Sequence, residues 1–188
     1  AMKVSGGDSF TNRLLFCFKH AVYNRSLAVL AVYGTGWIVA HPSQRSLIQR
    51  LIPGKIVGNE NPVCFHACSL GEVGVAYSII KAVKEKWPYQ KCILSVSTTS
   101  GMKAAIKSDA STEVTWFPVD LPWSVNRFFR QIKPSMLILT ESEFWPNAIS
   151  KAQCTGIPVA LVNGRISDKH YPRYQKYLPW IQGAFTGL

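Results

Sequence analysis

Three short segments of this sequence carry side chains that could do acid–base chemistry: residues 69–72, 140–147 and 163–167. Together they supply three carboxylates, an amide and a guanidinium: Glu72, Glu141, Glu143, Asn163 and Arg165. The chain has only 10 Asp and Glu among its 188 residues, so three carboxylates in such short segments stand out. Carboxylates grouped with a cation and an amide indicate acid–base work on a polar substrate rather than a solvated surface.

Each polar segment directly follows a short apolar run that is typical of a buried parallel strand. The chain contains five such runs, at residues 63–67, 92–96, 114–118, 136–140 and 159–162. Helix-length stretches begin near four residues: Val73, Thr99, Trp123 and Pro146. This alternation predicts an α/β fold, a Rossmann-like parallel sheet with helices on both faces. Because parallel strands share one carboxyl edge, the polar segments should meet there, where open α/β folds build their sites.

Each polar segment also has a purely structural interpretation. Gly71 allows close backbone approach to a ligand, and Glu72 at a helix start either acts on that ligand or only complements the helix dipole. Glu141 and Glu143 point the same way if their backbone is extended, and two like charges there cost energy unless a cation or a hydroxyl-rich ligand meets them. Arg165 could be that cation, either at a ligand or in a structural ion pair with Glu141 or Glu143.

The cysteines and histidines do not predict a metal site. Five cysteines are an odd number, and they lie mostly in apolar runs, as expected of reduced thiols facing a cytosol. Cys64, His66 and Cys68 would share one face of a strand, but no second Cys/His cluster completes a tetrahedral site, so burial in the core is expected. The Gly-x-Gly-x-x-Gly signature is absent after the first strand, which argues against a nicotinamide enzyme.

The net charge of +11 favours an anionic partner: phospholipid, a phosphorylated ligand or nucleic acid. Residues 165–177 interleave basic and aromatic side chains, a composition that can grip single-stranded nucleic acid. A solvated helix beside a site is the commoner origin of this pattern, so no nucleic-acid partner is expected.

The N-terminal third is more apolar than the rest of the chain. Residues 27–40 form an uninterrupted apolar stretch, shorter than the ~20 residues that a spanning helix needs. Basic residues flank it, and Tyr and Trp residues within and before it resemble an interfacial belt. We therefore expect residues 1–56 to form a helical segment on an anionic membrane surface, with a short basic helix over 45–50, and residues 57–188 to form the main domain. A core helix packed on the sheet is the alternative.

Four motifs in order along the chain complete the picture: residues 66–72, 118–122, 141–147 and 163–167. They closely resemble the N-terminal half of the 3-deoxy-D-manno-octulosonic acid (Kdo) transferases, and the resemblance covers nearly the whole chain. It implies the first half of a two-domain GT-B glycosyltransferase of lipopolysaccharide biosynthesis, in which this domain takes the lipid A precursor. The second domain, which binds the donor CMP-Kdo, would follow Leu188, so these residues alone should not complete catalysis.

The resemblance also implies residue roles. Glu72 would be the general base that deprotonates the acceptor hydroxyl in an inverting transfer, and Glu141 would stabilise the transition state. Five residues would position the acceptor: Ser69, Gly71, Glu143, Asn163 and Arg165. No metal or cofactor is implied besides the donor substrate, and the expected location is the cytoplasmic face of the bacterial inner membrane. Two other functions stay open: a membrane-tethered lipid-binding module without chemistry, and a nucleotide-sugar transferase of another GT-B family.

Overall fold

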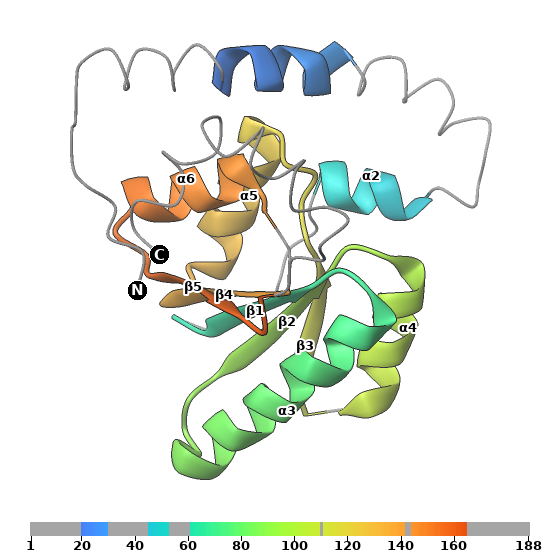
Figure 1. Ribbon diagram of the computed structural model, residues 1–188, viewed down its shortest axis with the longest axis vertical. Coiled ribbons are helices and arrows are strands. Elements are labelled where there is room, and N and C mark those ends of the chain that lie inside the picture. The colour runs from blue at the N-terminus through green and yellow to red at the C-terminus, as the bar shows by residue number, and fades with distance from the viewer. Residues whose placement is uncertain (1–19, 30–44, 53–60, 110, 142–143, 165–188) are drawn as a thin grey trace.

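The computed structural model describes residues 20–29, 45–52, 61–109, 111–141 and 144–164. Five strands form one parallel sheet in the order β3-β2-β1-β4-β5 (Figure 1). The strands are β1 (Val63–Ala67), β2 (Cys92–Val96), β3 (Glu113–Trp116), β4 (Met136–Thr140) and β5 (Val159–Val162). The labelled helices are α2 (Arg45–Leu51), α3 (Leu70–Lys86), α4 (Thr99–Ser108), α5 (Pro122–Ile132) and α6 (Pro146–Cys154). Residues 20–29 are also helical.

The predicted Rossmann-like fold is confirmed, and most element boundaries agree with it. Four of the strands have the predicted bounds, and the short helix expected over residues 45–50 is α2. β3 ends before its predicted end, because Pro118 has no amide hydrogen with which to extend the ladder. α3 begins at Leu70 rather than near Val73, because the Ser69 side chain caps the helix there.

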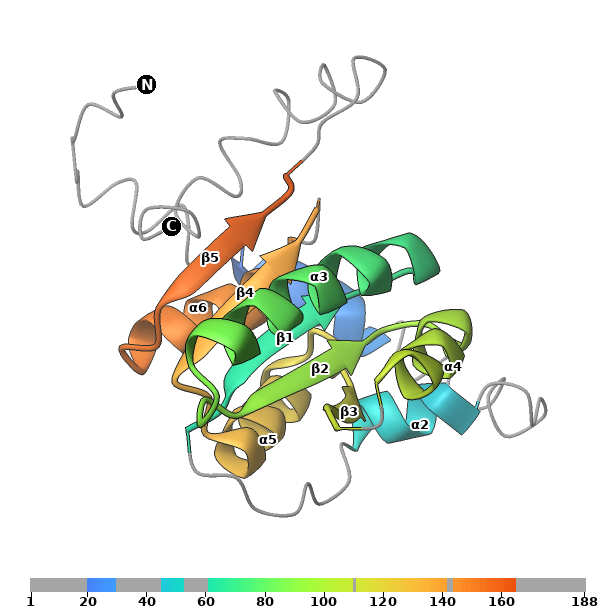
Figure 2. The ribbon, with the colours of Figure 1, turned by 90° about the horizontal axis from the view of Figure 1, so that it is seen from below.

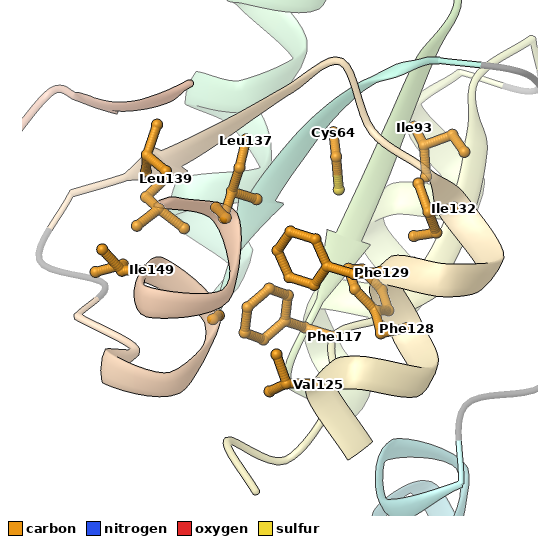
Figure 3. Packing of buried hydrophobic residues seen from close by; sticks show 13 residues of the cluster. Cys64, Ile93, Phe117, Val125, Phe128, Phe129, Ile132, Leu137, Leu139 and Ile149 are labelled. Carbon is orange, nitrogen blue, oxygen red and sulfur yellow. The ribbon is translucent and has the colours of Figure 1, made fainter. Parts of the chain in front are cut away.

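Helices cover both faces of the sheet. α3 and α4 lie on one face, and α5 and α6 lie on the other (Figure 2). Alternate strand residues face the two layers, so Cys64 packs with α5 and α6 while its neighbour Phe65 packs with α3 and α4. Figure 3 shows the layer between the sheet and helices α5 and α6, where the ring centroids of Phe117 and Phe128 lie 5.6 Å apart. Since both faces are covered, the strands are continuous apolar runs, which made them predictable.

The strand order reverses beside β1. From β1 the chain builds β2 and β3 on one side, and it then crosses back to add β4 and β5 on the other. Open α/β sheets bind their ligands outside the carboxyl ends of the strands at such a reversal. The three polar segments follow β1, β4 and β5, which are neighbours in the sheet. Glu72, Glu141 and Asn163 therefore follow strand ends at one edge of the sheet, as predicted, whereas residues 142–143 and 165–167 of these segments lie outside the described residues.

Residues 20–29 and α2 lie on the same side of the sheet as α5 and α6 (Figure 1). Arg50 fastens α2 to the ends of two strands, because Nε donates to the Phe117 carbonyl oxygen at 3.0 Å and Nη1 to that of Ser97 at 3.1 Å. Among the residues that the structure describes, no helix combines the length and apolar character needed to cross a bilayer. The boundary predicted between residues 56 and 57 lies outside the described residues.

Candidate active site at the carboxyl edge of the sheet

Glu72 lies in the first turn of α3, just after β1, and only 7% of it is exposed. Two hydrogen bonds hold its carboxylate: Oε2 accepts from the Cys68 backbone N–H and Oε1 from Ser69 Oγ, each at 2.7 Å. Ser69 Oγ in turn accepts from the Glu72 backbone N–H at 3.5 Å. This exchange between a Ser and a Glu three residues later is a variant of the capping box, in which the Glu side chain accepts from the amide of Cys68 instead of that of the N-cap residue Ser69. Glu72 therefore has a structural role at this helix end.

Leu70 and Gly71 precede this carboxylate on the first turn of α3. A Cβ added at Gly71 would meet nothing within 4 Å, so none of the described residues requires glycine there. Leu70 is 61% exposed. The close approach of a ligand to the Gly71 backbone stays a prediction.

Glu141 and Asn163 occupy the first positions after β4 and β5. The residues before them, Thr140 and Val162, are paired in the sheet, and the Glu141 amide donates to the Val162 carbonyl oxygen at 2.9 Å. Both residues have positive φ, 60° at Glu141 and 53° at Asn163. The extended backbone that would make Glu141 and Glu143 point the same way is therefore absent at Glu141. Left-handed backbone is uncommon for residues other than glycine and is enriched in asparagine.

Two predicted site residues, Glu143 and Arg165, lie outside the described residues. The ion pair considered for Arg165 therefore stays a prediction, as do the ligand contacts expected of both side chains.

Gly164 lies just after the end of β5. A Cβ atom added to it would lie 3.9 Å from the Glu141 carbonyl oxygen and 3.2 Å from Leu161 Cδ2. The end of β5 thus lies close to the backbone of Glu141.

Two threonine hydroxyls tie strand ends together at this edge. Thr140 Oγ1, at the end of β4, donates to the His66 carbonyl oxygen in β1 at 2.5 Å. Thr98 Oγ1, at the N-cap of α4, donates to the Cys68 carbonyl oxygen at 2.7 Å. Because the Cys68 amide also donates to Glu72, these bonds fix the backbone that orients the carboxylate.

Asp120, between β3 and α5, is a further carboxylate at this edge and is 1% exposed. It caps α6, because Oδ2 accepts from the Asn147 N–H at 3.0 Å and Oδ1 from the Ala148 N–H at 2.9 Å. The N-cap residue of α6 itself, Trp145, makes no side-chain hydrogen bond to the helix. Burial raises the pKa of Asp120 to about 6, although hydrogen bonds from Asn147, Tyr23 and Ala148 oppose that rise. No role was predicted for Asp120 from the sequence, because a cap that spans 27 residues leaves no local signal.

Tyr23 and Asn24 join the helix over residues 20–29 to this cap. Tyr23 Oη donates to Asp120 Oδ2 at 3.0 Å, and Asn147 Nδ2 donates to Asn24 Oδ1 at 2.7 Å. Asn147 Nδ2 also donates to the Asp120 carbonyl oxygen. Burial raises the pKa of Tyr23, and the Asp120 charge acts in the same direction, so the phenol keeps its proton as a donor. The helix over residues 20–29 is thus hydrogen-bonded to the residues that cap and begin α6.

The Cys and His residues of β1 belong to the core, as predicted. Cys64 and His66 are fully buried, while Cys68 just after the strand is partly buried. Burial raises the pKa of the Cys64 thiol to about 12. The His66 ring stacks on Phe117 with centroids 3.8 Å apart. Within the described parts of the chain, no group of three or more His, Cys, Asp or Glu could hold a metal ion.

Residues 43–188 match the sequence family described as 3-Deoxy-D-manno-octulosonic-acid transferase (kdotransferase). The chain is 30% identical over 128 residues to the 3-deoxy-D-manno-octulosonic acid transferase of Haemophilus influenzae, which covers 67% of this chain and 30% of that protein. It is 34% identical over 124 residues to a bifunctional glycosyltransferase/methyltransferase of Fusobacterium nucleatum, or 63% of this chain and 19% of that protein. It is also 33% identical over 118 residues to a probable mitochondrial 3-deoxy-D-manno-octulosonic acid transferase of Arabidopsis thaliana, or 62% of this chain and 26% of that protein.

The chain spans between 19% and 30% of the length of these relatives. The region that matches the family contains the whole sheet and all seven residues predicted for the site. Its carboxyl edge places Glu72, Glu141 and Asn163 after adjacent strands, at the position where α/β folds bind ligands. The sequence match covers most of the chain, and the fold is consistent with it; this chain therefore belongs to the Kdo transferase family.

Proposed function

We propose that this chain is the acceptor-binding domain of a glycosyltransferase that moves Kdo from CMP-Kdo to a lipid A precursor, lipid IVA, in lipopolysaccharide biosynthesis. The observation that supports this best is the placement of Glu72 and Glu141 after the adjacent strands β1 and β4, where the strand order reverses. Family membership indicates the reaction class. The donor would bind mainly to a second domain of the full-length protein.

Glu72 acts as the general base in this proposal. Each of its carboxylate oxygens accepts one hydrogen bond from the protein, which leaves further lone pairs for the acceptor hydroxyl. The hydroxyl proton moves to Glu72, and the hydroxyl oxygen bonds to the anomeric carbon of Kdo with inversion. The bond from that carbon to CMP breaks, and its electron pair leaves with CMP. A positioned base of this kind contributes about 10²–10⁴-fold to the rate.

The remaining site residues stabilise charge and position the acceptor. Glu141 faces the positive charge that develops on the donor sugar ring in the transition state. The acceptor is positioned by five residues: Ser69, Gly71, Glu143, Asn163 and Arg165. Ser69 also orients the base through its hydroxyl, and Arg165 supplies a fixed cation that can pair with an acceptor phosphate.

The helix over residues 20–29 supports a location on the cytoplasmic face of the inner membrane. Its side chains Tyr23 and Asn24 bond to the rest of the domain. Two apolar side chains face away, Val22 with 41% and Val29 with 53% exposure, and their spacing places them on one side of the helix. Arg25 and Ser26 lie between them on this exposed side, and a side that combines apolar residues with a basic one suits an anionic bilayer interface. The net charge of +11 adds attraction to an anionic leaflet.

The capping box favours a second candidate function. If the Glu72 carboxylate serves only to cap α3, the domain is a membrane-tethered lipid-binding module without chemistry of its own. The two functions differ in what they require of Glu72: a base must exchange a proton with the ligand, whereas a cap needs only to accept hydrogen bonds.

Two substitutions in the full-length protein separate these functions. Glu72→Gln removes the base and keeps the side-chain size, so transfer from CMP-Kdo to lipid IVA should fall at least about 100-fold. Ser78→Ala is the control, because Ser78 lies further along α3, its hydroxyl donates to the Gly74 carbonyl oxygen, and the substitution leaves the base in place. It should keep most of its transfer rate well below its Tm. Equal transfer by Glu72→Gln and the wild type would refute the base and favour the binding module.

A further inference from the structure

The reaction proposed above does not use Asp120, although this buried carboxylate makes hydrogen bonds in two directions. Toward α6 it accepts from the backbone amides of Asn147 and Ala148. Toward residues 20–29 it accepts from Tyr23, while the Asn147 side chain donates to Asn24. We call Tyr23, Asn24, Asp120 and Asn147 the polar latch.

The polar latch holds one end of the connection that leads from Glu141 to α6. The other end is fixed by the Glu141 amide, which donates to the Val162 carbonyl oxygen at 2.9 Å. Trp145, the last residue before α6, packs on Phe117 with ring centroids 5.5 Å apart. The first amides of a helix have no partner within the helix, so the Asp120 carboxylate fixes where α6 begins.

One atom of the polar latch, Asp120 Oδ2, accepts hydrogen bonds both from the helix over residues 20–29 and from α6. Asp120 Oδ2 accepts from Tyr23 Oη and from the Asn147 amide, each at 3.0 Å. A movement of residues 20–29 that draws Tyr23 away therefore changes the hydrogen bonding of the atom that caps α6. In the low-dielectric interior such linked hydrogen bonds polarise one another.

We propose that the polar latch couples the helix over residues 20–29 to Glu141 and to the neighbouring Asn163, which is proposed above to position the acceptor. Asp120 and Asn147 are then positioning residues for binding of the lipid acceptor. This inference rests on the proposed function, in which that helix meets the bilayer and the acceptor comes from the same bilayer. The residues that position the acceptor then have their binding arrangement when Tyr23 and Asn24 of this helix are hydrogen-bonded to Asp120 and Asn147. Neither Tyr23 nor Asn24 needs to touch the acceptor.

The test breaks the polar latch from the helix side in the full-length protein. Tyr23→Phe and Asn24→Ala each remove one hydrogen bond to the latch. Ser26→Ala is the matched control, because Ser26 lies on the same helix and its hydroxyl donates to the Val22 carbonyl oxygen one turn earlier, within the helix. For each protein, hydrogen exchange of the amides at the start of α6 is measured together with the KM values for lipid IVA and for CMP-Kdo.

Both latch variants should exchange the amides of Asn147 and Ala148 about tenfold faster than the wild type, since one charge-assisted or buried hydrogen bond is lost. Their KM for lipid IVA should rise about three- to tenfold with an unchanged KM for CMP-Kdo, while Ser26→Ala matches the wild type in all measurements. Unchanged exchange at α6 would overturn the coupling. Faster exchange with an unchanged acceptor KM would reduce the latch to a structural contact and overturn the positioning role. A wild-type protein without any Kdo transfer would instead refute the proposed function, and with it the role in acceptor binding, even if the exchange results stand.

Discussion

Glu141 and Asn163 adopt the same left-handed backbone conformation side by side, each immediately after a strand, with φ of 60° and 53°. They lie next to each other because the residues before them, Thr140 and Val162, are paired in register. Asparagine tolerates this conformation, whereas for glutamate it costs about 1–2 kcal/mol. A glutamate held in an unfavourable conformation at a ligand-binding edge is a candidate for function, because selection for stability alone would favour glycine there.

Replacement of Glu141 by glycine should therefore separate stability from activity. Relief of the left-handed strain offsets the greater flexibility of glycine in the unfolded chain, so the free energy of unfolding should stay level or rise by up to about 1 kcal/mol. Transfer should fall strongly because the carboxylate is lost. Urea unfolding and a transfer assay on the full-length protein measure the two effects. Glu141→Gln is the control, since it keeps the strain and loses only the charge; full activity in Glu141→Gly would show that the carboxylate is not needed.

Gly71→Ala tests whether a ligand approaches the start of α3. A Cβ there meets no protein atom within 4 Å, and alanine favours helix, so stability should not decrease. If the acceptor sugar approaches the Gly71 backbone, the added methyl group should raise the Kd for lipid IVA. Gly74→Ala is the matched control, because Gly74 also lies in α3 with open space at its Cβ position. Equal acceptor affinity in both variants would exclude close approach at Gly71.

The titration of Asp120 should make part of the stability depend on pH. Its pKa in the folded protein is about 6, raised from 3.8 chiefly by burial, so the folded state binds the proton more tightly than the unfolded state. The contribution of Asp120 to stability is therefore complete below about pH 4 and is lost as the pH rises through 6. The unfolding free energy of the wild type, relative to Asp120→Asn, should fall by up to about 3 kcal/mol between pH 4 and 7.

His20 must be controlled in that experiment, because it faces the same polar latch. Burial lowers its pKa, against the effect of its hydrogen bond with Asn147, so its contribution has the opposite sign and is lost as the pH falls. Tyr23 stays protonated over this range, since its pKa is raised. Repeating the urea titrations in a His20→Gln background isolates Asp120. A difference between the wild type and Asp120→Asn that does not vary with pH would mean that the hydrogen bonds to the carboxylate outweigh its burial.

Binding to anionic vesicles should depend on the outward side of residues 20–29. The double substitution of Val22 and Val29 by serine removes exposed apolar surface, so partitioning onto phosphatidylglycerol vesicles should weaken about tenfold or more, and high salt should weaken it further. Ile106→Ser is the control, because Ile106 is 64% exposed on α4, on the opposite face of the sheet. Point substitutions are preferable to deletion of the segment, since deletion also removes Tyr23 and Asn24 from the polar latch. Identical partitioning of the three proteins would place the membrane contact elsewhere.

The fold was predictable because its determinants are local. Strands covered on both faces appear as short apolar runs, whereas the Ser-x-x-Glu spacing at residues 69–72, which accompanies the start of α3 at Leu70, did not enter the prediction of a helix near Val73. What could not be predicted depends on contacts between distant segments. The Asp120 cap reaches α6 across 27 residues, and the left-handed backbone of Glu141 occurs at a residue type that seldom adopts it. Local patterns therefore indicated that Glu72 and Glu141 reach the edge, but not that Glu72 and Asp120 cap helices or how Glu141 is oriented.

The strand order also determines when the two proposed catalytic carboxylates first meet during synthesis. β1, β2 and β3 pair among themselves, and the Glu72 cap is made by residues within the same short segment. β4 must return to β1 over a long stretch of chain, as the Thr140–His66 hydrogen bond across 74 residues shows. Contacts between distant segments form late, because the loop must close before they are gained. A nascent chain that stops short of β4 would thus hold the proposed base in its final local structure with no opposing carboxylate, and the last two strands complete the site.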